Sequence, residues 1–212
     1  MEPHGEEPIV EQGEPIGKAP VLIMVHGRGA TPTDILELVP RLGRSGWTHL
    51  APTAAGRTWY PYSFMAAQAQ NEPGLSSAID VLRRLLERIM KSGVPPSRVV
   101  LLGFSQGACL TAEFAVRNPR RYGGVLVFSG GLIGAPGSID VSPGSFKGTP
   151  VFLGCSDTDA QVPRTRVEES AAIFTKMGAA ATCRIFPGMG HVVNDDEIAA
   201  AQQMMKNVDG RP

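Results

Sequence analysis

Residues 98–107 read RVVLLGFSQG, and this stretch decides the fold. The apolar run at 99–102 is typical of a buried strand, and a helical pattern follows over residues 106–117. Ser105 lies in the turn between them, with a glycine two residues before it and another two residues after it. Such a sharp turn strains the central residue and lifts its side chain above the sheet. Because the helix start also supplies free N–H groups, the pattern predicts a nucleophile at Ser105.

On both sides of this stretch, short apolar runs alternate with segments of helical period. Runs bounded by Gly or Pro fit strands that are buried on both faces. The alternation predicts an α/β fold whose mostly parallel central sheet is flanked by helices on both faces. The expected strands are 21–25, 99–104, 125–128, 151–153 and 182–186, with 49–52 as a weaker candidate. The expected helices are 33–44, an apolar stripe over 75–90, 106–117, 164–177 and 195–207.

The chain length of 212 residues fits one domain, which we place at residues 19–212. Residues 1–18 are an acidic tail, in which Ile9 and Val10 can begin an edge strand; we expect the first few residues to be disordered. Twenty basic and 20 acidic residues give a net charge of zero, which argues against a nucleic-acid partner or an anionic membrane bound by charge. No apolar run approaches the roughly 18 residues of a membrane span.

The cysteines and the acidic N-terminal residues give information on the cellular compartment. The three cysteines, Cys109, Cys155 and Cys183, are an odd number without metal-type spacing. The first residues lack the basic and apolar regions of a signal peptide. We therefore expect a reduced, cytoplasmic setting, and no metal or cofactor is implied.

A serine nucleophile needs a base, and the base needs an acid to orient it. His191 is the single histidine after Ser105, and it follows the last predicted strand in the glycine-rich stretch FPGMGH. Two acids, Asp157 and Asp159, follow the predicted strand at 151–153. The residues themselves leave both acids open.

An acyl-transfer site also needs two backbone N–H groups for the developing oxyanion. In this arrangement one comes from the residue after the nucleophile, here Gln106. The other comes from the loop after the first buried strand, which reads HGRGA, so the amide of Arg28 is the expected donor. His26, which begins that loop, lies in the wrong chain order for the base, so we expect a structural role for it.

Together these motifs resemble the α/β-hydrolase superfamily and, within it, the bacterial phospholipase/carboxylesterase family of acyl-protein thioesterase-like serine hydrolases. The resemblance spans residues 21 to about 205, and it implies that the acid lies three residues before a Val-Pro pair. Because Val162 and the proline after it form such a pair, the spacing that the resemblance implies selects Asp159 over Asp157. The matching motifs are HGRG at 26–29, GFSQG at 103–107, DAQVP at 159–163 and GMGH at 188–191.

The resemblance also suggests residues of the substrate pocket. The family places an aromatic pair in the loop after the second readable strand, where this chain has Trp59 and Tyr60, followed by Phe64 and later by Glu72. Those residues are expected to line the acyl or alcohol pocket. Thioesterase members usually carry Asp-Glu-Ala-Gly where this chain has NEPG at 71–74. The chain therefore looks closer to small bacterial esterases.

The resemblance implies a serine hydrolase that cleaves carboxylic esters of small molecules through an acyl-enzyme, with a homodimer as a candidate assembly. Residues 129–150 have no helical period, so we expect no large lid domain, an open site, and short to medium acyl chains. The alternatives on the same triad are a thioesterase, a lysophospholipase or a lactone hydrolase. A different class, a non-catalytic ligand-binding relative, is disfavoured by the complete set of Ser105, Asp159 and His191.

Overall fold

The computed structural model describes residues 2–139 and 141–209. Within these residues, one sheet has the strand order β1-β3-β2-β4-β5-β6-β7. Strand β1 is antiparallel to β3, whereas all other neighbouring pairs are parallel, as the sequence predicts. The strands are β1 (Ile9–Gly13), β2 (Val21–Val25), β3 (Thr48–Pro52), β4 (Val99–Phe104), β5 (Gly124–Phe128), β6 (Pro150–Ser156) and β7 (Ala180–Phe186).

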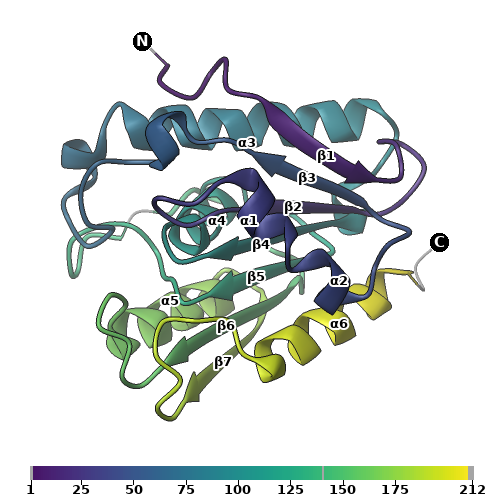
Figure 1. Cartoon of the computed structure of the whole chain (residues 1–212). Coiled ribbons are helices and arrows are strands. Elements are labelled where there is room, and N and C mark those ends of the chain that lie inside the picture. Colours follow the sequence, from purple (N-terminus) through teal and green to yellow (C-terminus); the bar gives the residue numbers. More distant parts are fainter. Residues whose placement is uncertain (1, 140, 210–212) are drawn as a thin grey trace.

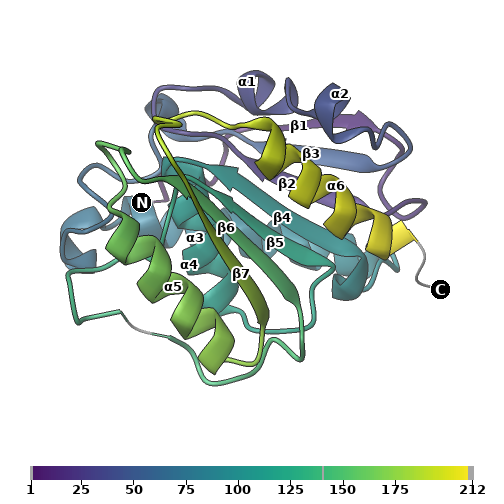
Figure 2. The same ribbon diagram turned by 90° about the horizontal axis from the view of Figure 1, so that it is seen from below.

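Helices cover both faces of the sheet (Figures 1 and 2), which confirms the predicted α/β architecture. One face carries α1, α2 and α6, and the other carries α3, α4 and α5. The strands contribute to both cores because neighbouring residues point to opposite faces. The helices are α1 (Pro32–Leu36), α2 (Val39–Leu42), α3 (Gly74–Lys91), α4 (Gln106–Arg117), α5 (Arg164–Lys176) and α6 (Asp195–Asp209), with short 3₁₀ helices η1 (Ala55–Arg57), η2 (Gln68–Asn71) and η3 (Pro96–Arg98). None of the helices in the described ranges is both long and apolar enough to cross a membrane.

The single helix expected over residues 33–44 is wrong, because two short helices occupy this segment. Thr31 caps the first one, in a capping box with Asp34. Pro40 is the second residue of α2; it has no N–H to donate, and its ring would clash with the carbonyl four residues earlier in a continuous helix. Pro40 therefore separates the two helices.

The acidic tail packs against the domain. The candidate edge strand at Ile9 and Val10 is β1, paired with β3. His4 is 2% exposed and its backbone N–H donates to Ser77 Oγ at 3.0 Å, so the disorder expected for the first residues is wrong at His4. Two glutamates of this segment pair with arginines of α3: Glu2 with Arg84 at 2.8 Å and Glu11 with Arg88 at 2.7 Å.

The parallel strands bring their carboxyl ends to one edge of the sheet. In parallel α/β sheets the loops at this edge build the ligand site. The described part of the segment between β5 and β6, residues 129–139 and 141–149, contains no helix or strand. The site at the sheet edge is therefore formed by loops rather than by a helical lid in this segment.

Candidate active site

The turn from β4 to α4 holds Ser105 in a strained conformation with φ 56° and ψ −122°. Its amide donates to the Phe128 carbonyl of β5 at 3.0 Å, which fixes the turn to the sheet. The two glycines are required by close approach. A Cβ on Gly103 would collide with the Gly107 carbonyl, and a Cβ on Gly107 would collide with the Val25 carbonyl. Close backbone contacts thus fix the turn that carries the serine side chain.

The structure brings Ser105, His191 and Asp159 together in one chain of hydrogen bonds. The distance from His191 Nε2 to Ser105 Oγ is 2.8 Å, and the distance from His191 Nδ1 to Asp159 Oδ2 is 2.7 Å. The carboxylate accepts the Nδ1 proton, which leaves Nε2 free to accept a proton from the serine. The resemblance-based choice of Asp159 thus matches the observed contact.

Asp159 is held by its own loop. Its side chain is fully buried, and its Oδ1 accepts the amides of Gln161 at 2.8 Å and Val162 at 3.0 Å. Burial raises the pKa of this carboxyl, but the bonds from His191 and from the two amides outweigh it and hold the pKa below its usual range. Asp159 is therefore the ionised partner that a neutral or protonated imidazole needs.

Two neighbours of Asp159 connect its loop to the loop of the histidine. Asp157 Oδ1 accepts the Gly188 amide at 2.8 Å, and Ser156 Oγ accepts the Gly190 amide at 3.0 Å. Asp157 thus reaches the histidine loop rather than the imidazole. The sequence separates the two acids only through the family resemblance, because both are short carboxylates in one loop.

A capping box fixes the other end of the histidine loop. Glu197 N donates to Asn194 Oδ1 at 2.8 Å, and Asn194 N donates to Glu197 Oε2 at 3.0 Å. Glu197 is fully buried, and its Oε1 has no hydrogen-bond partner among the described residues. Burial raises the pKa of this carboxyl to about 7. Our sequence reasoning missed this residue, although the spacing Asn-x-x-Glu before a helical pattern is a recognisable signal.

The amides of Arg28 and Gln106 flank the same turn. Neither amide donates to an acceptor in the described part of the chain, as two oxyanion donors require. The loop of Arg28 is shaped by the bond from Gly29 N to the Arg57 carbonyl at 2.8 Å. His26 is buried, with Nδ1 bonded to the Gly27 carbonyl at 2.8 Å, so its role is structural.

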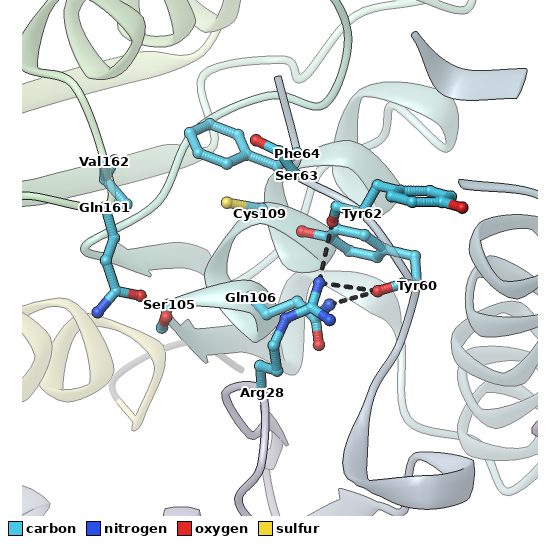
Figure 3. A pocket seen from close by; sticks show the side chains of 10 residues that line it. All are labelled: Arg28, Tyr60, Tyr62, Ser63, Phe64, Ser105, Gln106, Cys109, Gln161 and Val162. Atoms are coloured by element: carbon cyan, nitrogen blue, oxygen red, sulfur yellow. Dashed lines mark hydrogen bonds between the residues drawn. The ribbon is translucent and has the colours of Figure 1, made fainter. Parts of the chain in front are cut away.

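A cavity of about 180 Å³ opens beside Ser105 (Figure 3). One wall is the segment of residues 58–64, which we call the pocket loop. Both oxyanion candidates hold this loop by their side chains. Gln106 Nε2 and Arg28 Nη2 donate to the Tyr60 carbonyl at 2.8 and 2.9 Å. The cavity is lined by Arg28, Tyr60, Tyr62, Ser63, Phe64, Ser105, Gln106, Cys109, Gln161 and Val162.

The chain is similar to a known protein family. The family model described as Phospholipase/Carboxylesterase matches residues 5–208, which is nearly the whole chain. This chain belongs to the phospholipase/carboxylesterase family. The match includes the turn at Ser105 and the loops of Asp159 and His191.

Named relatives of this family member include esterases and thioesterases. A probable carboxylesterase of Oryza sativa subsp. japonica is 27% identical over 139 residues, 65% of this chain and 52% of that protein. Acyl-protein thioesterase 1 of Kluyveromyces lactis is 31% identical over 104 residues, 49% of this chain and 46% of that protein. The chain thus matches about half the length of these two relatives.

A solved structure of the same family is similar over nearly its full length. The phospholipase/carboxylesterase of Dyadobacter fermentans has a TM-score of 0.91 at 40% identity, and the match covers 95% of this chain and 97% of that one. SOBER1 of Arabidopsis thaliana has a TM-score of 0.76 at 20% identity over 90% and 99% of the two chains, which shows a shared fold.

Two of the expected pocket residues of this phospholipase/carboxylesterase lie elsewhere. Trp59 is fully buried, and its Nε1 donates to the His26 carbonyl at 2.9 Å. The Trp59 ring contacts the rings of His4 and His26, with centroids 5.4 and 5.0 Å away. Glu72 is exposed and accepts the Ser76 amide at 3.0 Å at the start of α3. The expectation that Trp59 and Glu72 line the pocket is therefore corrected, and Tyr60 and Phe64 are the predicted residues found there.

The cysteine nearest to the nucleophile also faces the cavity. Cys109 lies one turn along α4 from Ser105 and is 1% exposed. Burial raises the pKa of its thiol to about 12. The thiol is therefore protonated at neutral pH, which makes Cys109 a poorer candidate nucleophile than Ser105.

Proposed function

We propose that this protein is a serine hydrolase that cleaves carboxylic esters of short to medium acyl chain length through an acyl-enzyme. The observation that carries the proposal is the hydrogen-bond chain from Ser105 through His191 to Asp159, at 2.8 and 2.7 Å. A nucleophile, base and orienting acid at these distances are the parts that acyl transfer needs.

In the proposed mechanism, Ser105 Oγ attacks the ester carbonyl while His191 Nε2 takes the serine proton. The amides of Arg28 and Gln106 donate to the oxyanion of the tetrahedral intermediate. His191 then returns the proton to the leaving alcohol, and the acyl group stays on Ser105. Water repeats the sequence: His191 accepts its proton, the acid leaves, and the proton goes back to Ser105.

The proposed acyl preference rests on the cavity. A volume of about 180 Å³ next to Ser105, with Phe64 and Val162 as apolar walls, suits a short or medium chain. Related proteins named acyl-protein thioesterase favour thioesters as a second candidate substrate class. Parallel kinetics on butyrate esters of an alcohol and of a matched thiol would separate the two candidates by their kcat/KM.

Covalent labelling tests the reaction type. We expect one fluorophosphonate to attach per chain, at Ser105, together with turnover of 4-nitrophenyl butyrate. Ser105→Ala should lose both the label and all but a residual rate, a loss of about four orders of magnitude or more. Labelling without turnover would favour a ligand-binding relative, and turnover that survives in Ser105→Ala would contradict the nucleophile assignment.

A further inference from the structure

Arg28 is the one charged side chain among the residues that line the described cavity. The other lining residues are aromatic, aliphatic, hydroxyl, thiol or amide side chains, so no carboxylate of the lining offsets its charge. Arg28 is therefore the charged group that a molecule bound in this cavity would meet in its lining (Figure 3).

The hydrogen bonds of the Arg28 guanidinium all go to neutral acceptors. Nη2 donates to the carbonyls of Tyr60 and Tyr62, each at 2.9 Å, and Nη1 donates to the Pro61 carbonyl at 3.0 Å. A guanidinium has five N–H groups, so these bonds leave two of them available. Among the described residues, Arg28 makes no ion pair with an acid.

Two other exposed arginines, Arg83 and Arg164, pair with acids instead. Arg83 pairs with Asp80 and Glu87, each at 3.0 Å, and Arg164 pairs with Glu168 at 2.7 Å. Arg28 instead lines the same cavity as Ser105 and has no acidic partner among the described residues. At Tyr60, whose hydroxyl pKa is raised by burial, the charge of Arg28 lowers the pKa and the charge of Glu113 raises it.

We propose that Arg28 selects esters that carry a carboxylate on the acyl or the alcohol part. This inference rests on the proposed function and names its substrate class. The single positive charge of Arg28 matches one singly charged anion. A phosphate monoester carries about 1.5 to 2 negative charges, and the lining offers one positive charge to balance them. Because Arg28 is exposed to solvent, its contribution is selective rather than absolute.

Matched esters measure this selection. One pair differs in the alcohol: 4-carboxyphenyl butyrate and 4-carbamoylphenyl butyrate. The second pair differs in the acyl group: the mono-4-nitrophenyl ester of adipic acid and the same ester with its free carboxyl converted to the amide. The pair that responds tells which side of the ester carries the anion. The quantity compared is the ratio of kcat/KM for carboxylate over amide.

We expect this ratio to fall about fivefold in Arg28→Met, mostly through KM, for one of the two pairs. Arg28→Lys keeps the charge and should keep most of the ratio, although it loses the bonds to the three carbonyls. Arg83→Met, which removes an exposed arginine far from the cavity, should leave the ratio unchanged. A ratio that is the same in Arg28→Met and wild type for both pairs overturns the proposal.

Salt dependence of the wild-type enzyme supplies a test that needs no variant. Raising the ionic strength from about 0.05 to 0.5 M should lower the carboxylate-over-amide ratio, because exposed charges are screened. A ratio independent of salt for both pairs overturns the proposal even if Arg28→Met does not fold. Turnover of the neutral amide esters that depends on Ser105 would still support the proposed function, so the two failures are distinguishable.

Discussion

The nucleophile turn at residues 103–107 and the pocket loop at residues 58–64 face each other across one cavity, but they are fixed by different means. The turn is fixed by backbone contacts, because a Cβ on Gly103 or Gly107 would collide with main-chain atoms. The pocket loop is fixed by side chains from elsewhere: Arg28 and Gln106 bind its carbonyls, and Asn71 Oδ1 accepts the Tyr62 amide at 2.9 Å.

This difference separates what a local motif can encode from what it cannot. A backbone that must approach another backbone requires glycine at set positions, so five consecutive residues carry the information. A loop held by distant side chains carries no such spacing, since those side chains lie 8 to 55 residues away in the chain. The comparison predicts which substitutions stop the chemistry and which only weaken its surroundings.

The largest expected effect is a loss of kcat at Asp159. It tests whether loops other than the nucleophile turn also contain a group that catalysis requires. Asp159→Asn keeps the shape of the side chain but favours the wrong imidazole tautomer, so kcat on one activated ester should fall by about four orders of magnitude. Asp157→Asn weakens only the bond to the Gly188 amide, and kcat should fall by about tenfold. A dead Asp157 variant beside a nearly normal Asp159 variant would reverse the assignment of the acid.

Trp59→Ala addresses the anchor of the pocket loop. Because Trp59 is fully buried and packs between His4 and His26, its removal should lower the free energy of unfolding by about 3–5 kcal/mol. Urea unfolding measures this loss, and kcat per folded molecule at low temperature should stay within about tenfold of wild type. A stable variant with an altered acyl preference would instead indicate that Trp59 is a substrate-pocket residue.

Gly107→Ala tests the backbone-fixed side of the comparison. The added methyl group meets the Val25 and His26 carbonyls, which are main-chain atoms and cannot rotate away. We expect a stability loss of about 1–3 kcal/mol together with a large fall in kcat, because the turn must shift. Gly29→Ala is a control for the methyl group, since a Cβ there has no heavy atom within 4 Å, although its φ of 79° adds some strain. Normal kcat in Gly107→Ala would show that the turn is less constrained than its contacts indicate.

The histidine loop, which is held by side chains, should respond to pH through Glu197. Burial raises the pKa of this carboxyl to about 7, so the folded state holds a proton that the unfolded state has already released above its ordinary pKa of 4.5. Stability from this group is therefore present at low pH and is lost as pH rises through about 7. Thermal unfolding gives the free energy of unfolding of wild type and of Glu197→Gln. The wild-type value minus the variant value should fall between pH 5 and 8, by an amount on the order of 1–3 kcal/mol. A difference that does not change with pH would show that Glu197 is not protonated in the fold.

The smallest effect concerns a pocket wall that touches no catalytic group. Phe64→Ala enlarges the cavity, so kcat/KM for an octanoate ester should rise about 3- to 10-fold relative to the butyrate ester. Tyr62→Ala removes a side chain that is 60% exposed and should change this ratio less. A uniform slowing across a series of chain lengths would mean that Phe64 only stabilises the loop.

The fold followed from the sequence where hydrophobic period and chain breakers agree. The buried strands and the long helix α3 have unbroken patterns, so their positions were predictable. The division of residues 33–44 between two helices was not predicted, because Pro40 interrupts a segment whose apolar residues have a helical period. The cytoplasmic setting, the absence of a cofactor and the homodimer stay predictions.

At the site, the order of residues along the chain predicted Ser105 and His191, whereas the choice of Asp159 over Asp157 needed the family resemblance. The bond from Asp157 to the histidine loop was not predictable, because it depends on how two loops lie side by side after β6 and β7. The place of Trp59 was missed for a similar reason. An aromatic residue in a loop can face a cavity or a core, and His4, a residue 55 positions away, decides for the core.

The contact between His4 and Trp59 has a practical consequence for anyone who produces this protein. The His4 ring bonds the Trp59 carbonyl at 2.9 Å and the Ala55 amide at 3.0 Å, so the first residues act as a brace for the substrate cavity. We expect an affinity tag joined directly ahead of His4, or a clone trimmed to begin at β2, to disturb these two bonds and to change the activity that is assayed. Libraries aimed at new substrates can therefore include His4, which acts on the pocket loop without lining the cavity.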